Sequence, residues 1–315
     1  MRWFGRGQSQ SVDKERRLAE QEQAQATMEA LEDGRLPPYI RERIAEQRQG
    51  QLPWTSNLSV AEWLLTAKYR FRPLGMVMGS CFYHIGYSKA DLRGSWSAGE
   101  FTVIARAIRD GRTKALERMA MEAEELGANA VIGVRVDTRT PGYFGHDTEF
   151  TAFGTAVAID GLETHGRPLL CTVEGQELTK LLMHDSVPVG LALGVSVYYQ
   201  YTSWQDKRRE YSWFNQEMPS FTQAVYDARH NAMADMIRDA RSLKGNGILA
   251  HDTRMKVYEV EVERGENDER TDHILEVVSL GTVVSAQKRP LPLDIRPVLS
   301  MNDKVADLAF EPLGE

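Results

Sequence analysis

Residues 73–79 read PLGMVMG and residues 188–194 read PVGLALG, so the pattern P-x-G-x-x-x-G occurs twice, 115 residues apart. The same offset pairs Tyr83 with Tyr198. The apolar residues that follow each P-x-G are typical of a strand. The paired heptapeptides therefore predict two copies of one strand.

Two later blocks repeat in the same order. Residues 112–129 share arginine, alanine, leucine and asparagine positions with residues 229–246, at an offset of 117. FGTAV at 153–157 matches LGTVV at 280–284, at an offset of 127. Three blocks in one order, with an offset that grows slowly, indicate a tandem duplication with small loop insertions.

Each repeated unit predicts one helix and three strands. Apolar residues between Ile108 and Leu126 keep the three- and four-residue spacing of a helix, and Gly127 is placed to end it. Tyr258, Val260 and Val262 alternate with glutamates, which predicts one strand of a closing hairpin. The expected fold class is α+β, with two tandem β-α-β-β units, each a helix on an antiparallel three-stranded sheet.

The repeat divides the chain into four parts. Residues 1–55 form a helical arm rich in Gln, Glu, Arg and Ala, residues 56–165 the first unit, residues 166–287 the second unit, and residues 288–315 a proline-containing tail. The arm has few apolar residues to bury, so it either packs against the body or a partner, or stays mobile.

Each predicted unit leaves sheet edges and apolar surface open. Natural proteins usually pair or cover such edges. Two copies in one chain are expected to pair with each other, and the assembly is expected to continue into a homo-oligomeric ring.

The repeated segments resemble a known family. LGANAVIGVRVD from Leu126, the helix before it, the P-x-G-x-x-x-G strand and the late GTAV are similar to the YbjQ-like family of small bacterial proteins, which carries a heavy-metal-binding label. The resemblance covers residues 60–160 well, and residues 175–286 as a diverged second copy. It implies a dodecin-like β-α-β-β fold and ring-shaped oligomers, commonly pentamers of the single unit. It implies no established catalytic residue.

Composition excludes several classes. The net charge of -7 argues against a dedicated nucleic-acid binder, which normally has a basic excess. Two cysteines cannot form a disulfide framework, and the first ten residues lack the apolar core of a signal peptide. The longest apolar run, at 187–199, is too short for a transmembrane helix. These features predict a cytoplasmic protein without a transmembrane segment.

Cys81 and His84 form a C-x-x-H that suggests a metal site. Strand alternation, however, places Cys81 and His84 on opposite faces, and the second copy replaces them by Ser196 and Tyr199. A buried Cys81 and a His84 held at an interface are therefore expected. The candidate ligands of a divalent or soft metal ion are Cys81, His84 and His146.

Tyrosines repeat where the Cys and His do not. The candidate binding residues, near a unit or subunit contact, are Tyr83, His84, Tyr198 and Tyr199. A basic run at 207–209, amid aromatic residues up to Phe214, is expected to pack at a subunit or domain contact rather than on nucleic acid.

The sequence favours a non-enzymatic, homo-oligomeric ring protein that acts as an assembly or binding module for a small ligand, a metal ion or a partner protein. Its partners are other copies of itself, in a pentamer-like ring, and a protein partner held through the N-terminal arm or the C-terminal tail. Two alternatives stay open. One is a cytoplasmic heavy-metal-binding protein, and the other is a ring enzyme with intersubunit sites that use His84, Tyr83 and Cys81.

Overall fold

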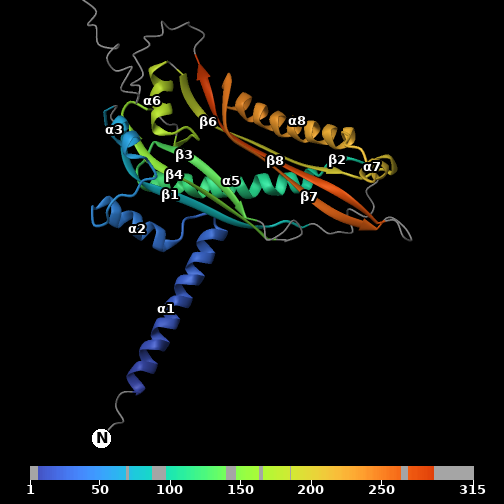
Figure 1. The fold of residues 1–315 in the computed structure, drawn as a ribbon. Helices are drawn as coiled ribbons and strands as arrows, with labels where there is room; N and C mark the ends of the chain where they lie inside the picture. Colours follow the sequence, from blue (N-terminus) through green and yellow to red (C-terminus); the bar gives the residue numbers. More distant parts are fainter. Residues whose placement is uncertain are drawn as a thin grey trace, which may run out of the picture.

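The computed structural model describes residues 6–68, 71–86, 97–139, 147–162, 166–184, 186–263 and 269–286 (Figure 1). In chain order the elements are α1 (Arg6–Glu32), α2 (Pro38–Arg48), α3 (Val60–Lys68), β1 (Phe71–His84), β2 (Gly99–Glu100), α5 (Thr102–Glu125), β3 (Ala130–Arg139), β4 (Asp147–Ile159), β5 (Leu169–Leu170), α6 (Gly175–Met183), β6 (Ser186–Gln200), α7 (Trp204–Glu210), α8 (Pro219–Ser242), β7 (Gly247–Glu263) and β8 (Glu269–Ala286).

Two sheets organise these elements, and the predicted α+β class is confirmed. The first sheet has the order β1-β4-β3-β5, and the second has the order β2-β6-β8-β7. In both sheets the opening strand pairs antiparallel with the last long strand, and its register shifts directly after the proline, between Pro73 and Gly75 and between Pro188 and Gly190. Gly190 has a φ of 150°, which L side chains rarely adopt, whereas a Cβ at Gly75 would overlap the Gln47 side chain, so both positions favour glycine.

The expected three-stranded sheets need a correction, since each carries a fourth strand of two residues. β5 pairs parallel with β3, and β2 pairs antiparallel with β6. Each short strand comes from the other side of the predicted boundary at residue 165. Edge strands carry unpaired backbone groups, which these short segments cover in part.

The second glycine of the repeated heptapeptide lets a helix lie directly on each opening strand. A Cβ at Gly79 would overlap the carbonyl oxygen of Ala115 in α5. A Cβ at Gly194 would overlap the carbonyl oxygen of Ala232 in α8 in the same way. The helix and strand backbones therefore approach closely in both halves because no side chain separates them.

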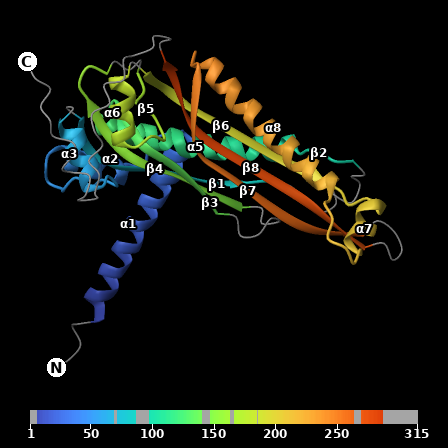
Figure 2. The ribbon, with the colours of Figure 1, turned by 45° about the horizontal axis from the view of Figure 1, so that its top comes forward.

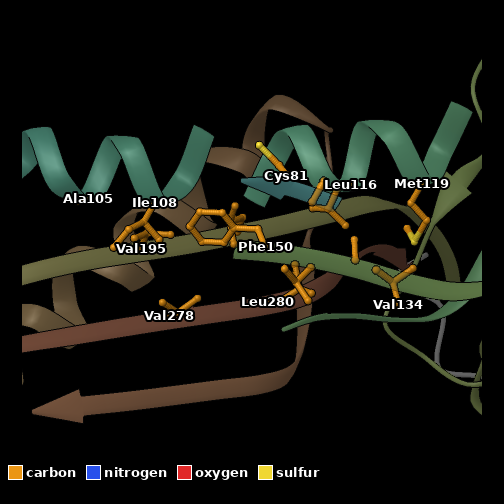
Figure 3. Close-up of a cluster of buried hydrophobic side chains, with 14 of the residues drawn as sticks. Cys81, Ala105, Ile108, Leu116, Met119, Val134, Phe150, Val195, Val278 and Leu280 are labelled. Atoms are coloured by element: carbon orange, nitrogen blue, oxygen red, sulfur yellow. The ribbon is translucent and has the colours of Figure 1, made fainter. Parts of the chain in front are cut away.

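The layers run first sheet, α5, second sheet, α8 (Figure 2). Alternate residues of β6 divide between the two sides: Ala192 packs with Met236 of α8, whereas Val195 and Val197 join the core that includes α5. Figure 3 shows the side chains that meet between the sheets. They come from α5 and from strands of both sheets (β1, β3, β4, β6 and β8) and include Ile108, Leu116, Phe150, Val195, Val278 and Leu280. One core thus joins both halves.

The arm makes a limited contact with this body. α1 projects away from the sheets, while α2 lies against α5 (Figure 1). Ile44 of α2 is buried, and Gln47 Nε2 donates to the Leu74 carbonyl of β1 at 2.7 Å. Within the described ranges, no helix is both long and apolar enough to cross a membrane. The tail at 288–315 lies outside the described residues.

Candidate functional site

The Cys-His pair occupies the end of β1, and its two members point in opposite directions. Cys81 is buried in the core that includes α5. Tyr83, on the same face, is partly buried, and the Lys114 ammonium lies 5.2 Å from its ring centroid. His84 is exposed on the other face, where its Nδ1 lies 3.0 Å from Asp147 Oδ1. Cys81 and His84 therefore cannot ligate one ion within this chain.

The remaining candidate ligands give no complete metal site. His146 lies outside the described residues. Among the residues that the structure does describe, no three His, Cys, Asp or Glu side chains converge as ion ligands would. Complete burial raises the pKa of the Cys171 thiol to about 12, so this cysteine stays a thiol at neutral pH. The described side chains do not fit a heavy-metal site.

The two candidate tyrosines of the second half have different surroundings. Tyr199 is fully buried, stacks on Phe101, and donates its hydroxyl hydrogen bond to the buried Asp272 carboxylate. Tyr198 is partly buried, and its hydroxyl donates to Asp227 Oδ2 at 3.2 Å. Burial, followed by the nearby Asp227 charge, raises the pKa of Tyr198. Both tyrosine hydroxyls donate to carboxylates of the same half.

The aromatic segment around α7 is exposed in this chain. Trp213 and Phe214 are almost fully accessible, and Trp204 and Tyr211 are mostly so. Lys207 lies with its ammonium 5.6 Å from the Trp204 ring centroid and donates to the Glu269 carbonyl of β8 at 3.0 Å. This exposed aromatic surface is therefore available for the expected contact with another subunit.

The strongest polar contacts join the two halves. Arg109 of α5 reaches across to α8, where its Nη2 lies 2.5 Å and 2.7 Å from the carboxylate oxygens of Asp239, and its Nη1 donates to the Leu193 carbonyl. Asp239 also accepts from the backbone N–H of Leu193 at 2.9 Å. In this partly buried pair, one guanidinium nitrogen contacts both carboxylate oxygens while the other donates to the strand, which holds the helix and strand in one register. We call this junction of α5 with β6 and α8 the seam.

A second anchor lies at the other end of the seam. Glu100 accepts from Ser196 Oγ at 2.6 Å, from the Val197 N–H at 3.1 Å and from Asn231 Nδ2 at 2.8 Å. Glu100 and Arg109 line one groove together with Thr102, Ala105, Val195 and Asp235. Glu100 thus accepts three hydrogen bonds from the second half of the chain, and the groove is a polar contact between the two halves.

α5 also carries a buried charged group, which bonds to β3 of the first sheet. Arg112 of α5 is buried, and it donates to Thr138 Oγ1 at 2.8 Å and to the Val136 carbonyl at 3.4 Å. Burial lowers its pKa to about 10, and the charge of Glu276 in the second sheet opposes that shift. Burial likewise raises the pKa of the Glu276 carboxyl. Burial causes both pKa shifts, and the attraction between Arg112 and Glu276, which opposes them, acts between the two halves.

Sequence reasoning missed the seam, although one signal was available. Glu122 and Asp239 are acidic residues at equivalent repeat positions, 117 residues apart. Glu122 accepts from the Met78 N–H at 2.8 Å, as Asp239 does from Leu193. An acidic residue repeated on the helix face beside the opening strand could have indicated this strand-edge contact.

His273 makes part of the fold sensitive to acid. Its ring meets Phe221 edge-on, with centroids 4.6 Å apart, and its buried Nδ1 has no hydrogen-bond partner among the residues that the structure describes. Burial lowers the pKa of His273 below its ordinary 6.5, against the opposing charges of Glu259, Asp272 and Glu210. Folding therefore favours the neutral His273 ring. Its contribution to the stability of the fold is present above the pKa of the unfolded chain and is lost as the pH falls through the pKa of the folded chain.

We therefore expect His273→Phe to reduce acid sensitivity. Urea midpoints measured from about pH 8 to about pH 5 should fall more for the wild type than for the variant. An identical fall in both proteins would contradict this assignment.

The fold and the seam define an α+β chain in which helix-covered sheets are stacked and joined through a polar and apolar interface. A family model described as "Putative heavy-metal-binding" matches residues 68–160. UPF0145 proteins of Pyrococcus horikoshii and Thermosipho africanus are 39% and 36% identical over 80 and 88 residues, which cover 25% and 27% of this chain and 67% and 80% of theirs. The chain belongs to this YbjQ-like, or UPF0145, family.

One relative matches far more of the chain. An encapsulin nanocompartment protein of Mycobacterium tuberculosis is 30% identical over 224 residues, which span 70% of this chain and 83% of that protein. The similarity therefore extends well beyond the residues matched by the family model.

Proposed function

We propose that this chain is a non-enzymatic assembly module of the cytoplasm, built from two tandem YbjQ-like units at residues 56–165 and 166–287. It associates with copies of itself into a pentamer-like ring and serves as a component of a protein nanocompartment. The arm at 1–55 and the tail at 288–315 are the segments that reach a partner protein. The long relative, which is itself a nanocompartment protein, supports this role.

Exposed apolar surface carries the proposal. Phe82 and Met78 of β1 are exposed, and so are Trp213 and Phe214 after α7. Monomeric proteins rarely expose contiguous apolar patches of this kind, and such patches usually mark interaction sites. The polar groups with displaced pKa values, such as Arg112 and Glu276, are by contrast engaged between the halves. The exposed apolar side chains thus support a role in association, whereas Arg112 and Glu276 attract each other between the halves.

Two other functions have weaker support. A heavy-metal-binding protein would need ligands beside the exposed His84–Asp147 pair. A ring enzyme using Cys81, Tyr83 and His84 would need the thiol at the surface, whereas Cys81 is buried. Both functions fit the described geometry less well than assembly does.

Native mass spectrometry of the purified protein at micromolar concentration tests the proposal, with metal analysis of the same sample. We expect a discrete multiple of the chain mass and no stoichiometric zinc, nickel or copper. A monomer would refute the assembly role. One metal ion per chain, lost in His84→Ala, would instead establish the metal-binding function.

A further inference from the structure

The seam provides a template for a contact that the chain can make with another copy. On its strand side, alternate residues of β6 are buried against the first half: Leu193, Val195 and Val197. On its helix side, α5 presents Ala105, Arg109 and Leu116. This contact lays a helix stripe on an apolar strand face, and the Arg109–Asp239 pair ties the two together.

The strand side of this contact is repeated on β1, where it is exposed. An offset of 115 places Met78, Ser80 and Phe82 at the positions of Leu193, Val195 and Val197. The equivalence is structural, since the bulge after the proline and the glycine beneath the helix coincide in β1 and β6. Yet Phe82 is 73% exposed and Met78 is 55% exposed, whereas Val197 is fully buried. We call Met76, Met78, Ser80 and Phe82 the β1 face.

The helix side is repeated on α8, where it is also exposed. An offset of 117 places Tyr226 at the position of Arg109, Met233 at that of Leu116 and Ile237 at that of Ala120. Leu116 and Ala120 are buried, but Ile237 is 42% exposed and Tyr226 is 62% exposed. We call Tyr226, Met233 and Ile237 the α8 stripe. Each half of the seam thus recurs once, at opposite ends of the layered chain (Figure 2).

Glu122 explains why α8 carries Tyr226 at the position that Arg109 holds in α5. Glu122, the counterpart of Asp239, already pairs with Arg43 of α2. A buried carboxylate needs one cation partner, and α2 supplies it within the chain. A helix that arrives at the β1 face needs no arginine at the position of Arg109, and Tyr226 of α8 is uncharged.

We propose that a second copy of this chain docks its α8 stripe onto the β1 face, which repeats the seam between molecules. The proposal rests on the self-assembly proposed above and specifies its interface. Such a contact is head-to-tail, because different surfaces of the two copies meet, and it continues until a ring closes or a filament grows. The stack of sheet and helix layers within one chain then extends from each copy into the next.

Two surface variants test this arrangement. Phe82→Glu damages only the β1 face, and Tyr226→Glu damages only the α8 stripe, so each variant alone should be monomeric in native mass spectrometry. Mixed in equal amounts, they should form a dimer, because the intact stripe of the first meets the intact face of the second. Met255→Glu, on the exposed part of β7, is the matched control and should keep the wild-type assembly.

The outcomes separate this interface from the assembly role. Wild-type oligomers that persist in both variants would overturn the interface and leave self-assembly standing. Folded variants that fail to dimerise when mixed would overturn the head-to-tail geometry. A monomeric wild type would overturn both proposals. Circular dichroism and thermal midpoints verify that each variant is folded, which is expected because both altered side chains are exposed.

Discussion

Gly79→Val is expected to lower the free energy of unfolding by about 3 kcal/mol. The added side chain would overlap the Ala115 carbonyl oxygen and the Met119 N–H of α5, which are backbone atoms and cannot rotate away. The helix must then move off the strand, and Val77 and Met119, both fully buried, lose their packing. Urea denaturation followed by circular dichroism measures the loss.

Gly99→Val is the matched control for this prediction. Gly99 also lies in a strand, but an added Cβ there meets no atom within 4 Å. Its unfolding midpoint should stay close to that of the wild type. Equal midpoints for the Gly79 and Gly99 variants would show that the helix does not need the close approach seen in the fold.

Asp272→Ala is expected to destabilise the chain by about 3 kcal/mol. The carboxylate is fully buried and accepts the hydroxyl hydrogen bond of Tyr199 and, at 2.7 Å, the N–H of Thr202. Its removal leaves both donors buried without this acceptor, and each such group costs about 1–3 kcal/mol. Thermal and urea unfolding report the change, and near-UV circular dichroism reports the packing of Tyr199.

Asp147→Ala is the control for Asp272→Ala. It removes an exposed carboxylate, so it separates the effect of burial from the effect of losing a carboxylate. Asp147 pairs with His84 at the surface, where both side chains are mostly exposed. Exposed ion pairs contribute about 0–1 kcal/mol, so this variant should unfold almost as the wild type does. A comparable loss in the Asp147 and Asp272 variants would mean that the buried acceptor has no special role.

The sequence predicted the elements better than the contacts between them. The spacing from Ile108 to Leu126 indicated a helix, and α5 spans Thr102–Glu125. The alternation at Tyr258, Val260 and Val262 indicated a strand, and all three lie in β7. Both patterns are local, because each periodicity reflects the burial of one side of one element. The short strands β2 and β5 carried no such pattern, since two residues have no period.

The candidate site residues show the same difference between what local patterns predict and what tertiary contacts decide. Alternation along β1 was enough to separate Cys81 from His84, and the structure has Cys81 in the core and His84 at the surface. Nothing local distinguished Tyr199, which is buried against Asp272, from its neighbour Tyr198, which bonds Asp227. The two partners lie 29 and 73 residues away in sequence, so only the folded chain reveals these contacts.

The sequence by itself determined the repeated order of strand, helix and strands, because glycine, proline and apolar spacing act over a few residues. Only the tertiary structure decided which copy of each surface is buried. In the strands, Val197 is buried whereas Phe82, at the equivalent position, is exposed. In the helices, Leu116 is buried whereas Met233, at the equivalent position, is partly exposed. The physical reason is that burial depends on the neighbour that a surface meets, and each end of a stack of two units lacks one neighbour.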